Sequence, residues 1–148
     1  MEKPGTPVIG SIALAILAAV VLVVIARIVQ SDVAFCREVF RGLVEGKPSV
    51  QRRIDWEHLS ALNVNVGATY TRLPNDQERA DYRRTFIEHF SKGFRQVGGT
   101  TAGFRHWRVL ARKDQKVVVA ADYEAKQKTL LMSVPASGTR KLETIQWQ

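Results

Sequence analysis

The stretch that decides the fold reads FRHWRVLARKDQKVVVAADYEAKQKTLLMSVPASGTRKLETIQW and covers residues 104–147. Apolar and polar residues alternate along it or form short apolar runs, and polar turns interrupt it at residues 113–115, 124–127 and 136–139. Such segments are typical of β-strands, and strands joined by loops this short are antiparallel neighbours. We therefore expect a four-stranded antiparallel meander at the C-terminal end.

Helical patterns precede these strands. Behind the capping residues Ser31 and Asp32, apolar side chains recur at helical spacing as far as Val44, and Gly46 and Pro48 end that helix. A second, shorter helix is expected after Pro48, with its apolar stripe on Val50, Ile54, Leu59 and Leu62. Residues 63–69 fit a short strand or a turn equally well.

The strongest helical pattern begins at Asn75, where Glu78 three residues later completes a capping box, and it ends at Gly98 and Gly99. One face of this helix is apolar and carries Tyr82, Phe86, Ile87, Phe90, Phe94 and Val97. Three of these phenylalanines recur every four residues, so we expect the sheet face beneath this helix to be the main core.

About three helices followed by a curved antiparallel sheet form an α+β domain, with the helices packed on one face. The opening helix over residues 35–47, closed by a glycine, together with the strands at residues 117–123 and 144–147, resembles the nuclear transport factor 2-like superfamily. Ketosteroid isomerase and SnoaL-type proteins share that fold. The resemblance covers roughly residues 32–148 and implies a cone-shaped domain that is able to enclose a ligand.

Residues 8–26 form an uncharged run of 19 residues. As a helix the run spans roughly 28 Å, close to the ~30 Å hydrocarbon core of a bilayer. A cleaved signal peptide is the alternative, but the run is longer than a usual signal core and no small-x-small site follows it. We therefore expect a short tail at residues 1–7, an uncleaved single-pass anchor at residues 8–29 and the α+β domain at residues 30–148.

The side of the membrane on which the domain lies is open. Arg27, Arg37 and Arg41 follow the apolar run, whereas only Lys3 precedes it, so the positive-inside rule weakly favours a cytoplasmic domain. With its anchor, the chain also resembles small bacterial membrane-anchored members of the superfamily, such as the Mce-associated membrane proteins and the inner-membrane scaffold of type IV secretion. Those families imply a domain outside the cytoplasm.

The implied cone directs attention to aromatic residues and carboxylates. We take as candidates for a ligand pocket Trp56, Tyr70, Trp107, Tyr123 and Trp147. Ketosteroid isomerases use a carboxylate base with hydrogen-bonding groups, and the residues here of suitable type are Asp55, Asp122, Tyr70, Tyr82 and Tyr123. Strand alternation places Asp122 and Tyr123 on opposite faces, so at most one of them points into a cone. No spacing makes these groups converge on one substrate atom, and we assign no catalytic residue.

Other chemistry has little support in the sequence. The three histidines, His58, His89 and His106, are dispersed and lack metal-ligand spacing, so no metal or cofactor is expected. Cys36 lies on the apolar stripe of its helix, where a small core residue is more common than a nucleophile. Nucleic acid is an unlikely partner because no recognised binding module accompanies the tryptophans.

The chain is basic, with 22 Lys and Arg against 14 Asp and Glu and a net charge of +8. Arg79, Arg83 and Arg84 share one helix, and we take them as candidates for contact with anionic lipid headgroups, although a solvated face explains them equally. The leading hypothesis is a membrane-tethered, non-catalytic module that binds another membrane protein or carries a small apolar ligand. The alternative is a tethered isomerase-, hydrolase- or dehydratase-like enzyme that uses the cone.

Overall fold

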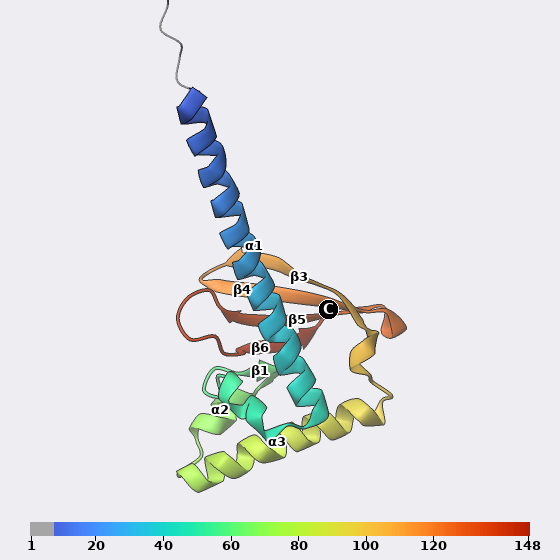
Figure 1. The fold of residues 1–148 in the computed structure, drawn as a ribbon. Coiled ribbons are helices and arrows are strands. Elements are labelled where there is room, and N and C mark those ends of the chain that lie inside the picture. Colours follow the sequence, from blue (N-terminus) through green and yellow to red (C-terminus); the bar gives the residue numbers. More distant parts are fainter. Residues whose placement is uncertain (1–7) are drawn as a thin grey trace, which may run out of the picture. The chain divides into compact units, whose positions relative to one another are not determined.

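The computed structural model describes residues 8–148, with side chains from Leu14 onward except Val29. The tail expected at residues 1–7 lies outside the described residues. The elements in chain order are α1 (Val8–Glu45), the 3-10 helix η1 (Pro48–Arg53), β1 (Ser60–Ala61), β2 (Val64–Asn65), α2 (Val66–Thr71), α3 (Asp76–Gln96), η2 (Thr101–Gly103), β3 (Phe104–Lys113), β4 (Lys116–Tyr123), η3 (Glu124–Lys126), β5 (Lys128–Pro135) and β6 (Thr144–Trp147) (Figure 1).

The chain divides into two compact units, and the boundary falls between Ser31 and Asp32. In the first unit, the large apolar side chains described between Leu14 and Ile28 are 44–69% exposed. The helix that carries them is the one helix among the described residues that is long and apolar enough to cross a membrane. A signal sequence near an N-terminus also meets this criterion of length and hydropathy, so the criterion alone does not separate the two.

The second unit is an α+β domain built on a six-stranded mixed sheet in the order β2-β1-β6-β5-β4-β3. Strands β3, β4, β5 and β6 pair with their chain neighbours in antiparallel fashion, and β1 pairs with β6 in parallel. The sheet is therefore wider than the four strands expected from the sequence. The additional strands β1 and β2 contain two residues each, which is too short for a period of two to be visible.

The expected second helix is wrong beyond Arg53. Only Pro48–Arg53 is helical, and Ile54 instead forms an isolated parallel bridge with Leu142. Leu62 has a positive φ of 51° and its side chain is 44% exposed, so it belongs to the turn between β1 and β2 and not to an apolar stripe. The ambiguous residues 63–69 contribute to both β2 and α2, and the Asn65 side chain caps α2 by accepting from the backbone N–H of Ala68 at 2.9 Å.

The long helix α3 is confirmed at both ends. The Asn75 side chain accepts a hydrogen bond from the backbone N–H of Glu78 at 2.8 Å, as a capping box requires. After Gln96 the chain leaves the helix through Gly98, whose φ of 72° is favoured by glycine.

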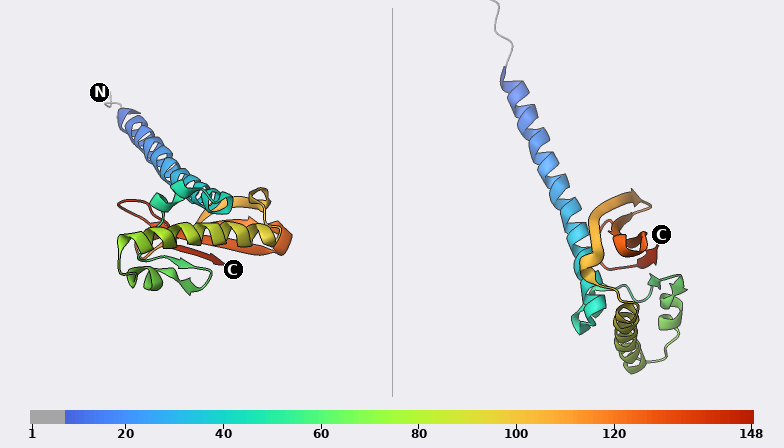
Figure 2. Two further views of the ribbon diagram at one scale, coloured as in Figure 1. Left: turned by 90° about the horizontal axis from the view of Figure 1, so that it is seen from below. Right: turned by 90° about the vertical axis from the view of Figure 1, so that its right-hand side faces the viewer.

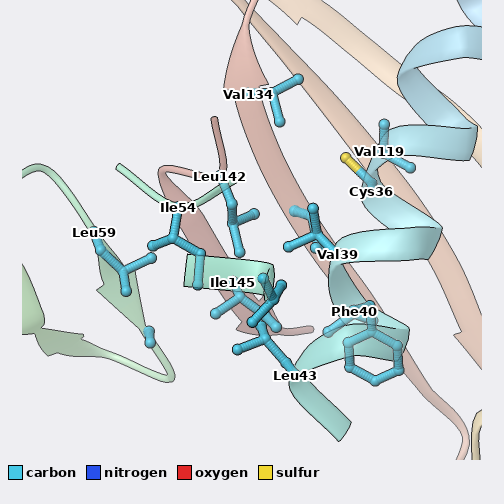
Figure 3. Packing of buried hydrophobic residues seen from close by; sticks show 14 of the residues in the cluster. Cys36, Val39, Phe40, Leu43, Ile54, Leu59, Val119, Val134, Leu142 and Ile145 are labelled. Atoms are coloured by element: carbon cyan, nitrogen blue, oxygen red, sulfur yellow. The ribbon is translucent and has the colours of Figure 1, made fainter. Parts of the chain in front are cut away.

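The core of the domain lies chiefly between the sheet and residues 32–45 of α1. Cys36, Val39, Phe40 and Leu43 are nearly inaccessible, and Figure 3 shows them pointing toward the sheet. They pack with inward side chains of the strands, among them Val119, Val134 and Ile145, and with Leu142 from the segment before β6. The turned views in Figure 2 agree with Figure 1 in placing this part of α1 alongside the strands.

The helix α3 contributes less to the core than its phenylalanines suggested. Its fully buried residues are Ile87 and Ser91, whereas Phe86, Phe90 and Phe94 are half-buried and Val97 is 61% exposed. The Ser91 hydroxyl donates to the Val44 carbonyl at 2.7 Å and so joins α3 to the end of α1. The expectation that this helix covers the main core is therefore wrong: its phenylalanines form one edge of the core.

Candidate ligand pocket

The five aromatic residues proposed as pocket candidates fall into two separate clusters. Trp56 and Tyr70 are both buried, with ring centroids 6.0 Å apart. The other three surround Phe104, whose ring lies 4.6 Å from that of Tyr123, 5.8 Å from that of Trp147 and 6.4 Å from that of Trp107. The structure therefore does not bring all five together.

A pocket of about 330 Å³ lies beside the second cluster, and only Tyr123 and Trp147 of the five candidates line it. Its apolar floor comes from α1 and the sheet, through Phe40, Leu130 and Ile145. Its wall is one face of α3, made by His89, Phe90, Gly93, Phe94 and Val97. The size is at the lower end of the ~300–1,000 Å³ typical of small-molecule sites.

Two glycines shape the pocket wall. A Cβ atom added to Gly93 would meet nothing within 4 Å, so the missing side chain leaves open space beside the last turn of α3. A Cβ added to Gly99 would lie 2.6 Å from the Phe94 ring, so this glycine lets the chain close tightly over that ring. One glycine provides room and the other holds the aromatic wall in place.

The charged groups that line the pocket are all basic. They are Lys126 and Lys128, together with the titratable His89. The lysines flank Gln127, whose left-handed φ of 50° makes the turn between η3 and β5. Within residues 8–148, neither lysine side chain forms an ion pair or a hydrogen bond, and all three residues are exposed.

The carboxylates considered as a catalytic base do not line this pocket. Asp122 accepts hydrogen bonds from both terminal nitrogens of Arg108, at 3.0 and 3.2 Å, and the Arg108 hydrogen bond holds the pKa of Asp122 below its usual value. Asp55 lies 3.0 Å from the His58 ring. Each carboxylate is committed to a local partner, so neither is placed to remove a proton from a molecule in the pocket.

The arginines proposed to meet anionic lipid are largely engaged with neighbours. The Arg83 guanidinium donates to the Tyr70 hydroxyl at 2.6 Å, and it lies with that of Arg79 over the Tyr70 ring, 5.9 and 5.8 Å from its centroid. Arg84 donates to Asp81 at 2.7 Å. Tyr82 packs on Tyr70 with ring centroids 6.2 Å apart. The Trp56 and Tyr70 cluster is thus a cation–aromatic stack.

Metal and thiol chemistry have no visible site in the described part of the chain. No group of three or more His, Cys, Asp or Glu side chains within residues 8–148 is arranged to hold a metal ion. The Cys36 side chain is buried in the core and unpaired with another cysteine.

Sequence reasoning missed several pocket residues, of which Gly93, Lys126 and Lys128 matter most. A glycine inside a long helix lowers stability by roughly 1 kcal/mol relative to alanine. Its presence at position 93 could therefore have indicated that space is required beside the helix there. Nothing in the sequence indicates that Lys126 and Lys128 line a pocket, because basic turns between strands are common on protein surfaces.

Comparison with known proteins finds no family model that matches this chain, and no curated protein or solved structure that it resembles at a significant level.

Proposed function

We propose that this chain is a single-pass membrane protein whose domain is a non-catalytic binding module for a small apolar ligand. The observation that carries the proposal is the pocket beside Tyr123 and Trp147, which is apolar in its floor and walls and has no carboxylate in its lining. Pockets of this size with mostly apolar walls and a few polar groups are typical ligand sites.

Binding is favoured over catalysis by the polar groups at the pocket. A general base must lie within hydrogen-bond reach of the proton it takes and must be held by a partner. His89 is exposed, and no hydrogen bond within residues 8–148 orients its ring. Lys126 and Lys128 at the rim are exposed, so they are better placed to attract an anion than to act as a general acid or base. The enzyme alternative therefore has the weaker support.

A nuclear transport factor 2-like cone is also part of the proposal. Its support is the order of elements, with helices first and consecutive antiparallel strands last, and a pocket between a long helix and the sheet. Fold likeness alone does not fix a function, so the binding role rests on the pocket itself.

The proposed membrane location rests on the apolar N-terminal part of α1. Its described side chains are exposed, and this part of the helix is long and apolar enough to span a bilayer. We also propose that the tethered domain binds another membrane protein or anionic lipid, because the chain has a net charge of +8. The charge rule favours a cytoplasmic domain and the family resemblance favours an external one.

Quenching of tryptophan fluorescence tests the binding role. The full chain in phosphatidylcholine nanodiscs is titrated with a neutral decanol that carries bromine on its terminal carbon. The signal is the quenching that the wild-type chain shows and a Trp147→Phe variant lacks, because Trp147 lines the pocket and Trp56 and Trp107 do not.

We expect saturable quenching of Trp147 and its loss in Gly93→Leu, which fills the space that Gly93 leaves open. Lys113→Leu, an exposed change outside the pocket, is the control and should bind as wild type does. Quenching that is linear in probe concentration, or identical in Gly93→Leu, contradicts a binding pocket here.

A further inference from the structure

The charged side chains at the rim of the pocket are all basic. Lys126, Lys128 and His89 reach it from the β4–β5 turn and from α3, and no acidic residue lines it. Glu124, the acidic residue nearest to the two lysines in sequence, lies 3.7 Å from Arg105 and so is directed to another partner. Glu88 is adjacent to His89 in sequence but does not line the pocket. The positive charge at the rim is therefore not neutralised by the residues that form the site.

The interior is the opposite in character. Phe40, Phe94, Leu130 and Ile145 present hydrocarbon surface, and Tyr123 is 7% exposed. Two large apolar side chains at the mouth, Leu62 and Val97, are 44% and 61% exposed, so the apolar surface continues outward from the interior. Exposed apolar surface joined to a pocket is a common mark of a binding site.

We propose that the occupant of this pocket is a single-chain anionic amphiphile, with its hydrocarbon chain inside and its acidic head at Lys126 and Lys128. This inference rests on the proposed binding function. A volume of about 330 Å³ has room for one short chain and not for the paired chains of a bilayer lipid. The head is a carboxylate or a phosphate monoester, since both present an anion to ammonium groups.

The lysines act as charges at the entrance and not as buried ligands. Lysine offers a mobile point charge that stays hydrated, so its contribution to affinity is modest and depends on salt. The chain of the ligand supplies most of the affinity through burial, and the rim selects the charged form of the head over a neutral one.

The test compares two probes of equal length in the full chain in phosphatidylcholine nanodiscs. The probes are decanoate and decanol, each with bromine on the terminal carbon. Binding is measured by the quenching that depends on Trp147. Each exposed ion pair contributes at most about a fivefold change in affinity, so with two lysines we expect decanoate to bind about three- to tenfold tighter than decanol at low salt, with the ratio falling toward one at high salt. Decyl phosphate serves as a competitor and distinguishes the two head types.

The variant Lys126→Gln/Lys128→Gln should bring decanoate to the affinity of decanol and leave decanol binding unchanged. Its control, Lys113→Gln/Lys141→Gln, removes the same charge from exposed positions outside the pocket and should preserve the ratio. Equal affinity of the wild type for both probes, or a ratio that survives loss of the rim lysines, overturns the anionic ligand and leaves the binding pocket standing. Failure of both probes to quench Trp147 overturns the pocket as well.

Discussion

At the scale of single residues, Asp32 is the one charged residue that is buried among the residues the structure describes. Its side chain is 4% exposed and lies 2.7 Å from an Arg112 nitrogen and 2.9 Å from an Arg140 nitrogen. Arg112 comes from β3 and Arg140 from the segment before β6, so one carboxylate connects α1 to two distant parts of the chain. A buried carboxylate is tolerated only with such partners, because burial without them costs several kcal/mol.

Removing the charge at Asp32 should cost less than removing its partners. In Asp32→Asn the two arginines lose their anion, but both are 40% exposed and remain hydrated, so we expect a loss of about 1–2 kcal/mol. Arg112→Gln/Arg140→Gln leaves the carboxylate buried and alone, with an expected cost of about 3–5 kcal/mol. Urea unfolding of the three chains gives the order. A larger loss in Asp32→Asn than in the double variant contradicts this account.

Two helical glycines should respond to alanine in opposite ways. A Cβ at Gly67 would lie 2.2 Å from the Glu57 carbonyl oxygen, and a backbone atom is slow to yield, so Gly67→Ala should destabilise by roughly 1–3 kcal/mol. Gly93→Ala meets open space and should stabilise α3 by about 0.5–1 kcal/mol through helix propensity. Thermal melting of both variants checks this. A gain in both would mean that Glu57 moves away without cost.

At the scale of elements, the division of the core between α1 and α3 sets the cost of losing a phenylalanine. Phe40 is 2% exposed, and its ring meets those of Phe94, Phe104 and Trp107. Phe90 is half-buried on the pocket wall. We expect Phe40→Ala to cost about 3–5 kcal/mol and Phe90→Ala about 1–2 kcal/mol. Denaturant unfolding measures both, and equal losses would show that α3 contributes as much core as α1.

The elements that could be predicted are those whose pattern is long or capped by side chains. The helix α3 has a capping box at Asn75 and a glycine stop, and β4 and β5 are largely apolar eight-residue segments bounded by polar turns. The two-residue strand β1 pairs with Thr144 and Ile145 of β6, and β2 in turn pairs with β1. These short strands are stabilised by tertiary contacts, so the local sequence pattern does not predict them.

The candidate site was predicted only in part for a similar reason. Tyr123 and Trp147 were proposed as aromatic residues of the expected sheet, and they meet at the pocket because β4 and β6 flank β5, with the two ring centroids 6.1 Å apart. Trp56 and Tyr70 lie in another cluster, because the turns after η1 carry them toward Arg79 and Arg83. Aromatic residue type predicts burial well, but it does not predict which buried cluster a ring joins.

At the scale of the whole molecule, α1 contributes to both units of the chain. The helix runs without interruption from Val8 to Glu45, and its residues from Asp32 onward supply much of the domain core. Asp32 and Cys36 are among the least exposed of these side chains. A processing event in this region would therefore remove core residues together with the apolar segment.

The apolar segment should accordingly remain attached to the mature protein. Cleavage after Asp32 and before Arg37 would remove Asp32, and the domain would lose the ion pairs to Arg112 and Arg140. We expect the full chain to stay with membranes through an alkaline carbonate wash, since about 20 apolar residues suffice to span a bilayer. N-terminal sequencing of that fraction should find no start between Ser31 and Arg37. A chain that begins there, or release of the protein by carbonate, would contradict an uncleaved anchor, and a start after Asp32 would also mean that the domain folds without this residue.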